Sequence, residues 1–552
     1  MTEKADLILT NARIYTCDPG NEWVEAIAVA DGKIVALGSA NSVDSYATAD
    51  TEIVDVGGRM VMPGLCDVHA HIGMGGAQVA WELSFGPGSD LKDILAQVEA
   101  RAATIGPDEW VIGGIVGSPL MDELAKGGYL EALDEASAGR PVLLRDDSHH
   151  NRWVNSRALE LAGVGPETPN PAGGTYVRDA SGKLTGVLHE SGCDAVEDAA
   201  ARSIINPAER DVVSLRTAVK LLNTFGITAI QDAGTSERDL RALSTLDDNG
   251  ELTAWVVGSL PARPFFGEEF VGEELFAASR AYRRTHVRPD FVKLFLDGVP
   301  MTRTSALLKP YVCHGDHEDP EDAGPLFWTT DDVVAMLRRC QELGFGAKLH
   351  ATGDRSVRQA LDAIEVIRKQ LGDEQRFHIA HIAYIDAADL PRFAELDVVP
   401  DASPYIWYPT PIDDSIANQV PAELLKTNWA FKDLLDSGAC LAAGSDWPVV
   451  PVPSPWIAME TMVTRANPDP AVPGENNPDQ KIDVRDAISA FTRNSARALG
   501  FGDSIGVLAP GKSADFIVLN QNLFDIEPNE IHQTQVELTY FGGTRVYDRH
   551  VA

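Results

Sequence analysis

The N-terminal segment of the chain alternates apolar and polar residues over short runs. The runs ADLILTNARIYT, AIAVADGKIVALG and TEIVDVGGRMVMPG contain Asp-Gly and Gly-Gly pairs, which favour tight turns between strands. The C-terminal segment has the same pattern in IGVLAPGKSADFIVLN and VELTYFGGTRVYDR. We therefore expect the two chain ends to form one small β-sheet domain together.

The middle of the chain alternates strand-like runs with helical patterns. VKLFLDG is followed by TTDDVVAMLRRCQELG, FGAKLHATG, RSVRQALDAIEVIRKQLG and RFHIAHI. The two helical segments have apolar residues near 3.6-residue spacing and end at Gly344 and Gly372, as helices often do. Strands that alternate with helices in this way predict a parallel sheet, either a barrel or a doubly wound sheet. Residues 75–170 fit neither pattern, and we expect an irregular insertion there.

Composition narrows the class of protein. At 552 residues the chain exceeds one ordinary domain, although a barrel with insertions reaches this size. The net charge of -36 argues against nucleic acid and anionic membrane surfaces as partners. The six cysteines are scattered without a CxxC pair, which favours free thiols in a reducing compartment. We find no signal-peptide pattern and no membrane-spanning apolar run, so we expect a cytoplasmic protein.

His69 and His71 end the run MVMPGLCDVHAH. Residues i and i+2 of a strand face the same way, so the two imidazoles can bind one ion. An isolated His-x-His pair is more often two packed or solvated histidines. Here the pair lies at the C-terminal end of a strand, where the active sites of α/β barrels lie, and this favours a metal site.

Lys293 is the unexpected residue in FVKLFLDG, because a lysine is costly to bury as a cation inside an apolar strand. It is either a surface lysine on an edge strand or a lysine that loses its proton and reacts with carbon dioxide. The resulting carbamate is an anion whose two oxygens can bridge two metals.

Three more candidate ligands end strand-like runs. His350 ends KLH, and His381 ends FHIAH in the next βα repeat. Two histidines at successive strand ends are harder to dismiss as structural than one. His378, three residues before His381, faces away and is left out. Asp446 follows LAAGS, where a carboxylate can bind the ion and take a proton from water.

These residues together resemble a known group. PGLCDVHAH, VKLFLDG, LHATGDRSV, HIAHI and GSDWPV, in that order, resemble the amidohydrolase superfamily, and within it the amidohydrolase 3 or YtcJ-like family, which includes N-substituted formamide deformylases. The tail FTRNSARALGFGDSIGVLAPGKSADFIVLNQNLF and the segments RPVLLRDDSHHNRWVNSRALELAG and GGTYVRDASGKLTGVLHE extend the resemblance over nearly the whole chain. Two features depart from the family pattern: Ala380 precedes the fourth histidine where Glu is common, and GVPMTRTSAL follows the lysine strand where a Gly-Ser pair is common.

The resemblance implies an α/β fold, a distorted (β/α)8 TIM barrel with a β-sandwich formed from both chain ends. Residues 1–62 and 501–552 would form the sandwich and residues 63–500 the barrel, with the insertion at about 75–170. It also implies a binuclear zinc site, although one ion or another divalent metal is left open. His69 and His71 would hold one metal and His350 and His381 the other, with carboxylated Lys293 as the bridge. Asp446 would bind the first metal and shuttle protons.

Candidate substrate contacts lie outside the metal ligands. They are His150, Trp153, Arg303, Tyr405, Trp407, Tyr408 and Trp447. His150 and Arg303 are also candidate catalytic groups; His150 would polarise a carbonyl, although His149 competes for that role. For each aromatic residue, core packing is the alternative to an aromatic pocket wall. Cys313, His314 and His317 lie in an acidic run without a fourth ligand, which favours a solvated loop over a zinc site.

The predicted activity is hydrolysis of an amide, formamide or cyclic amide C–N bond by a metal-activated hydroxide. The substrate is expected to be a small apolar or aromatic molecule, and a homodimer is left open. Three alternatives remain at this stage: a cyclase that forms a C–N bond at the same site, an ester or phosphoester hydrolase, and a scaffold without catalysis. The six intact ligands argue against the scaffold.

Overall fold

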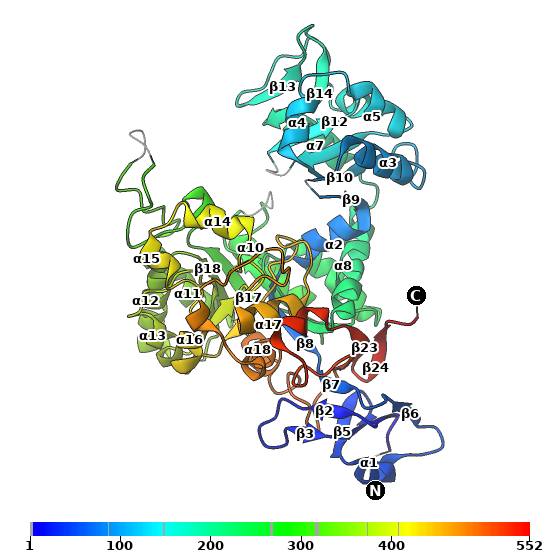
Figure 1. Ribbon diagram of the computed structural model, residues 1–552, viewed down its shortest axis with the longest axis vertical. Helices are drawn as coiled ribbons and strands as arrows, with labels where there is room; N and C mark the ends of the chain where they lie inside the picture. Colours follow the sequence, from blue (N-terminus) through cyan, green and yellow to red (C-terminus); the bar gives the residue numbers. More distant parts are fainter. Residues whose placement is uncertain are drawn as a thin grey trace. The chain divides into compact units, whose positions relative to one another are not determined.

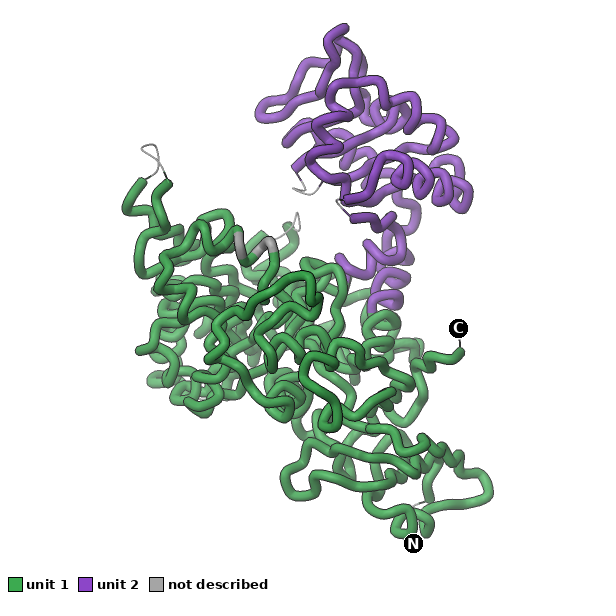
Figure 2. The backbone as a smooth tube through the Cα atoms, in the orientation of Figure 1, with its two compact units in different colours: residues 1–72, 219–552 green, residues 73–218 purple. Residues whose placement is uncertain are grey.

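The computed structural model describes residues 4–86, 88–146, 150–264, 269–314, 319–372, 374–406 and 408–551. They divide into two compact units, residues 1–72 with 219–552 and residues 73–218 (Figures 1 and 2). The predicted division has three parts, a sandwich, a barrel and an insertion at about 75–170, and it stays a prediction. Among the described helices, none combines the length and the apolar character needed to cross a membrane.

The first unit contains an eight-stranded parallel sheet that forms the barrel. The edge strands of this sheet are β8 (Leu65–Ala70) and β21 (Ala442–Ala443). Ala70 at the end of β8 forms an isolated parallel bridge with Trp447, which follows β21, so the barrel is nearly closed. Most of its strands are buried along their whole length, which explains why they read as continuous apolar runs. The strands are β8 (Leu65–Ala70), β15 (Ile227–Asp232), β16 (Trp255–Pro261), β17 (Val287–Phe295), β18 (Gly346–Ala351), β19 (Phe377–His381), β20 (Val398–Ala402) and β21 (Ala442–Ala443).

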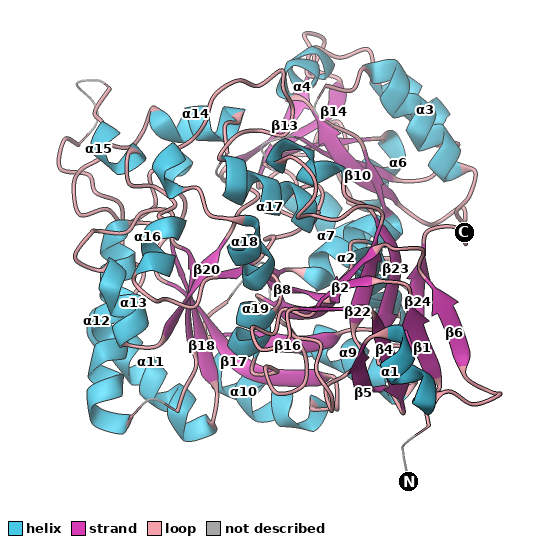
Figure 3. Cartoon of the chain, turned by 60° about the horizontal axis from the view of Figure 1, so that its bottom comes forward, coloured by secondary structure: helices cyan, strands magenta, loops and turns pink. Residues whose placement is uncertain are grey.

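Helices follow the barrel strands and lie on their outer side (Figure 3). Two of them confirm the predicted periodicity: α11 (Thr330–Leu343) and α12 (Asp354–Leu371) end at Gly344 and Gly372, which both adopt positive φ. The other helices of eight or more residues that lie wholly in this unit are α9 (Glu237–Asp248), α10 (Gly272–Ser279) and α17 (Pro455–Thr464). Short helices in this part of the unit include α13 (Leu390–Glu395), α14 (Pro411–Ala417), α15 (Ala422–Leu425), α16 (Phe431–Asp436), α18 (Val484–Ala490) and α19 (Arg493–Leu499).

The two chain ends together form two further sheets in the same unit, as the sequence predicted. A four-stranded sheet has the order β5 (Lys33–Gly38), β4 (Ala26–Ala30), β1 (Leu7–Thr10) and β6 (Glu52–Asp55). A six-stranded sheet has the order β24 (Thr544–Asp548), β23 (Val536–Phe541), β22 (Phe516–Leu519), β7 (Met60–Pro63), β2 (Arg13–Tyr15) and β3 (Trp23–Val24). Leu9, Ile27, Val61 and Phe516 share one buried core, so residues from the two chain ends form a β-sandwich.

Residues 73–218 are more regular than the sequence suggested. They contain a six-stranded sheet with its own apolar core, flanked by α3 (Leu91–Ala102), α6 (Ser156–Leu161) and α7 (Asp194–Arg202). α2 (Ile72–Trp81) and α8 (Pro207–Thr224) lie at the two ends of this segment. The strand order is β13 (Gly174–Arg178), β14 (Leu184–Glu190), β12 (Asn151–Val154), β11 (Val142–Asp146), β10 (Val111–Val116) and β9 (Glu82–Ser84).

Candidate active site

All six predicted metal ligands lie on barrel strands or shortly after their carboxyl ends. His69 is near the end of β8 and His71 follows that strand, while Lys293 lies in β17. His350 lies in β18, His381 ends β19, and Asp446 follows β21. Because the strands are parallel, their carboxyl ends meet at one end of the barrel, and this topology brings distant parts of the sequence together.

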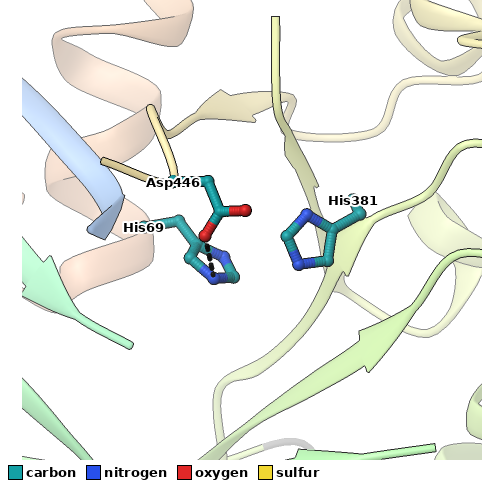
Figure 4. Close-up of side chains that lie close together, drawn as sticks. All are labelled: His69, His381 and Asp446. Carbon is teal, nitrogen blue, oxygen red and sulfur yellow. Dashed lines mark ion pairs between the residues drawn. The ribbon is translucent and has the colours of Figure 1, made fainter. Parts of the chain in front are cut away.

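Contacts between these side chains join them into one group, which we call the floor cluster: His69, His71, Lys293, His350, His381 and Asp446. His69 Nε2 lies 3.2 Å from Lys293 Nζ and 3.6 Å from Asp446 Oδ1. His71 Nε2 lies 3.4 Å from the same Asp446 oxygen. The His381 ring centroid lies 4.7 Å from that of His69 and 4.5 Å from that of His350. One ligand atom from each of His69, His381 and Asp446 falls within 4.8 Å of the other two (Figure 4).

The backbone around Asp446 fixes its carboxylate beside the histidines. Asp446 N donates to the His69 carbonyl at 2.7 Å, and His71 N donates to the Trp447 carbonyl at 2.7 Å. Gly444 makes this approach feasible, because a Cβ at that position would lie 2.4 Å from His69 Cβ. Asp446 and His381 both adopt left-handed backbone conformations, with φ of 59° and 72°. Such conformations are costly for non-glycine residues and concentrate at functional sites.

Each of three imidazoles uses one ring nitrogen for a supporting hydrogen bond. His69 Nδ1 lies 2.9 Å from Asp401 Oδ2, and His381 Nδ1 lies 3.0 Å from Ser403 Oγ. His350 Nε2 lies 3.0 Å from the Gly298 carbonyl, which can only accept. These contacts leave Nε2 of His69 and His381, and Nδ1 of His350, to face another partner. This arrangement is typical of metal-ligating histidines, whose second nitrogen is held by protein groups.

Burial sets the charge states of the floor cluster. It lowers the pKa values of His69, His350 and His381, so these imidazoles are neutral and can donate lone pairs. Burial alone raises the pKa of Asp446, but the hydrogen bond from His71 and the field of nearby side chains lower it to about 2. Burial and the neighbouring Lys348 lower the pKa of Lys293 to about 7. Neutral imidazoles, a carboxylate and an amine that readily loses its proton form a donor set that fits a divalent metal such as zinc.

Two buried charges that support the cluster were missed by the sequence analysis. Lys348 is fully buried in β18 and forms an ion pair with Asp401, whose Oδ2 also contacts His69. Lys348 pairs in register with Lys293 across β17 and β18. The signal was a charged residue inside an otherwise apolar strand, in KLHA and in VVPDA. The sequence analysis used this signal for Lys293 only.

Asp297 is the third missed residue and organises the loops next to the cluster. Its carboxylate accepts hydrogen bonds from the backbone nitrogens of Ala306, Thr352 and Gly353 at 2.9–3.0 Å and from Ser356 Oγ at 2.6 Å. These bonds tie the segment after β17 to the start of α12. Asp297 thus holds the Gly298 region that supports His350.

A cavity of about 400 Å³ opens above part of the floor cluster. His350, His381 and Asp446 line its polar end, and Thr352 and Thr410 add hydroxyl groups. The remaining lining is apolar or aromatic. It comes from the segments 299–301 and 449–452, from Tyr405, Ile406 and Tyr408, from Ile416 in α14 and Ile457 in α17, and from Ala383 and Trp429. A volume of this size suits a small-molecule ligand.

The predicted substrate contacts in the first unit have different surroundings. Tyr405 and Tyr408 line the cavity, whereas the side chain of Trp447 is buried and is not part of its lining. Arg303 also lies outside the lining: its Nε donates to Asp322 at 3.1 Å and its Nη1 to the Val312 carbonyl. Trp407 lies outside the described residues. For Trp447, core packing was the alternative that the sequence left open.

The predicted contacts near residue 150 belong to the unit of residues 73–218. Trp153 is fully buried in the apolar core of that unit, which is the surrounding that the core-packing alternative describes, and its role as a substrate contact stays a prediction. His150 is largely exposed, and its Nδ1 lies 2.9 Å from a Glu190 carboxylate oxygen. His149, its competitor for the carbonyl-polarising role, lies outside the described residues, so the role predicted for His150 stays a prediction.

Two other histidines that the sequence set apart from the ligands are also placed. His378 is buried, its Nε2 lies 3.1 Å from the Ala498 carbonyl, and its ring packs against Phe291. His314 Nε2 lies 2.6 Å from the Asn418 carbonyl, and His317 lies outside the described residues. Neither described histidine joins the floor cluster.

Comparison with known proteins supports the resemblance read from the motifs. The chain is 28% identical over its full length to N-substituted formamide deformylase of Arthrobacter pascens, covering 99% of that protein. It is also 28% identical to the putative amidohydrolase YtcJ of Bacillus subtilis, over 97% of this chain and 98% of that protein. An uncharacterized metal-dependent hydrolase from Pyrococcus horikoshii has the same fold, with a TM-score of 0.74, 23% identity, and coverage of 95% of this chain and 99% of that one. The model of the amidohydrolase family matches residues 52–547, and the chain therefore belongs to the amidohydrolase family.

Proposed function

We propose that this protein hydrolyses the C–N bond of an amide, formamide or cyclic amide with the help of a divalent metal held by the floor cluster. The convergence of six ligand-type side chains, three of which line the polar end of an apolar cavity, carries this proposal. Burying imidazoles and a carboxylate together does not stabilise the fold, because each group costs free energy to desolvate. Their burial in one cluster therefore points to a function such as metal binding.

The residues that would hold the metal are those of the floor cluster, with zinc as the preferred ion. His69, His71 and Asp446 would serve one ion and His350 and His381 a second. Lys293, as a carbamate, would contact both. A bound divalent ion lowers the pKa of water and polarises a carbonyl oxygen.

Asp446 would move the protons of the reaction. Its carboxylate, ionised because its pKa is about 2, accepts a proton from the attacking water. The water oxygen forms a bond to the acyl carbon and the C–N bond breaks. Asp446 then delivers the proton to the leaving nitrogen, so amide and water give a carboxylic acid and an amine. Its backbone bond to His69 and its contact with His71 hold the carboxylate in place for both transfers.

Two buried groups would keep the ligands oriented. Asp401 and Ser403 hold Nδ1 of His69 and His381, so both rings direct Nε2 away from these supports. The Lys348 ammonium balances the charge of Asp401. Because the supports lie on or directly after barrel strands, the ligand set is preorganised.

The choice of substrate class draws on the relative from Arthrobacter pascens, which is named as a deformylase of N-substituted formamides. A formyl group is the smallest acyl group, and a cavity of about 400 Å³ would leave its space to the substituent on nitrogen. Formamides with an apolar nitrogen substituent are therefore the first compounds to test.

A substrate panel tests the proposal. The zinc-loaded protein is incubated with N-benzylformamide, N-benzylacetamide, a cyclic amide, benzyl formate and a phosphodiester, and acid and amine products are quantified by chromatography. We expect turnover of at least one amide and loss of that turnover in Asp446→Asn. Cleavage of only the ester or the phosphodiester, with every amide intact, would contradict the proposal.

A further inference from the structure

The lining of the cavity has almost no charge. Among the described lining residues, Asp446 is the only one with a formally charged side chain, and it lies at the reacting end. No lysine or arginine is found among the lining residues that the structure describes. Apolar contacts therefore dominate the space that a substrate would fill beyond the reacting end.

Three cations that lie close to described lining residues are engaged with other groups. Arg303, which follows the lining residues 299–301, donates to Asp322 and to the Val312 carbonyl. Arg465 lies against the lining residue Trp429, and its guanidinium donates to the carbonyls of Trp429 and Asn476. Lys348 lies below the cluster in its ion pair with Asp401.

The mouth of the cavity is apolar as well. Val449 and Val452 belong to the lining and are 63% and 46% exposed, and Val299 on the other loop is 36% exposed. Deeper lining residues such as Tyr405, Ile416 and Trp429 are buried. An elongated ligand would therefore meet apolar side chains along its length, from the buried wall to the solvent.

We propose that the site selects neutral amides with an apolar arm and rejects analogues that carry a carboxylate on that arm. This proposal rests on the proposed function, since it names the substrate class of the same site. A carboxylate on the arm would lose water against apolar side chains without gaining a cation.

The proposal distinguishes this protein from amide hydrolases that process acylated amino acids or peptides. Their substrates carry a carboxylate near the scissile bond, and such a group is generally recognised by arginine or lysine. The described part of the cavity lining offers no such cationic partner. Charge, more than size, is therefore expected to set the limit on accepted substrates.

A matched pair of substrates tests the charge alone. N-formylphenylglycinamide and N-formylphenylglycine have nearly the same size and shape, but only the second carries a carboxylate; both enantiomers of each are used. We expect kcat/KM for the carboxamide to exceed that for the carboxylate on the order of 100-fold, as an unpaired buried charge implies. Values within threefold of each other would overturn the proposal.

A charge added at the mouth tests the location. Val449→Arg supplies a cation on an exposed lining residue, and we expect it to reduce the preference for the carboxamide by about tenfold. Val449→Met adds bulk without charge, and Ile53→Arg adds the same charge on β6 of the sandwich; neither should change the preference. A preference that is equal in Val449→Arg and Val449→Met would overturn the proposal.

Binding measurements separate this proposal from the proposed function. Titration calorimetry with the N-acetyl analogues of the same pair reports affinity even if no substrate is cleaved. Tighter binding of the carboxamide, without turnover of any amide, would contradict the proposed function and support the selectivity. Turnover of both substrates with equal affinities would support the function and overturn the selectivity.

Discussion

The polar floor and the apolar wall of the cavity differ in how they are built. The floor residues lie on or directly after barrel strands, and hydrogen bonds from groups such as Asp401, Ser403 and Gly298 fix their side chains. The wall residues are the apolar and aromatic lining residues; they come mainly from the segments 299–301, 405–406 and 449–452 and from Tyr408, with Ile416 in α14 and Ile457 in α17. Strand-borne groups are held rigidly, whereas loops tolerate substitution. This difference suggests that the floor performs the reaction and the wall selects the substrate.

Replacing the proposed proton carrier should have the largest effect of any floor substitution. Asp446→Asn keeps the size of the side chain but cannot accept the proton, so we expect kcat to fall on the order of 10²–10⁴-fold with little change in KM. Steady-state kinetics with N-benzylformamide measures this. Because an amide can still bind a metal through oxygen, elemental analysis of the variant should show that most metal is retained. A near-normal kcat would assign the proton transfer to another residue.

Removing the proposed bridge should reduce both metal content and activity. Lys293→Ala takes away the amine that lies 3.2 Å from His69 Nε2, and we expect at least one metal site to lose occupancy. Elemental analysis checks occupancy, and short carboxylic acids should restore part of the activity by filling the vacated space. Lys293→Glu is the matched variant, because it restores a carboxylate on a shorter side chain. Full activity in Lys293→Ala would make the lysine a structural residue.

The carbamate should form faster at higher pH. Only the neutral amine reacts with carbon dioxide, and the pKa of Lys293 is lowered to about 7 by burial and by Lys348. The neutral fraction therefore rises as the pH rises through 7, by about tenfold between pH 6 and pH 8. Reactivation of chelated protein by zinc, at a fixed concentration of dissolved carbon dioxide, should follow this rise. A rate that is independent of pH would argue against carbamate formation.

The close backbone approach at Gly444 should make the floor intolerant of even one methyl group. A Cβ there would lie 2.4 Å from His69 Cβ and 2.6 Å from His69 N, so Gly444→Ala should destabilise the protein by about 1–3 kcal/mol. Thermal unfolding measures this cost. Gly86→Ala is the control, because a Cβ at Gly86 meets no atom within 4 Å. Equal unfolding temperatures for the two variants would contradict the packing argument.

A substitution in the wall should have the smallest effect, and it should appear in binding. Tyr408 lines the cavity, so Tyr408→Ala should raise KM several-fold for N-benzylformamide but little for N-methylformamide. Tyr408→Phe keeps the ring and should behave like the unmodified protein. An equal loss of kcat for both substrates would place Tyr408 in the catalytic step and weaken the division between floor and wall.

The strand and helix pattern predicted a parallel sheet and a sheet domain shared by the two chain ends, and the family resemblance predicted the barrel and the grouping of the six floor residues. The sequence did not reveal the supporting pair of Lys348 and Asp401, since a buried ion pair joins residues 53 positions apart in the chain. The sequence also did not show that Trp153 is buried in an apolar core, because an aromatic residue has the same local pattern in a core and in a pocket wall.

The sequence did not reveal the regular structure of residues 75–170 for a similar physical reason. Strand β10 contains Gly113 and Gly114, which usually weaken a strand. In the structure, a Cβ at Gly113 would lie 2.5 Å from the Leu83 carbonyl oxygen, so the glycine permits close approach of two paired strands. Only the partner strand reveals this requirement, and the sequence alone does not identify that partner.

Metal titration tests the central claim most directly. Protein freed of metal by chelation and then dialysed receives zinc in steps, and turnover of N-benzylformamide is measured at each step beside the zinc bound. We predict no turnover without metal, a rise in turnover with bound zinc, and a plateau between one and two equivalents of zinc per chain. Full turnover by the metal-free protein would contradict it.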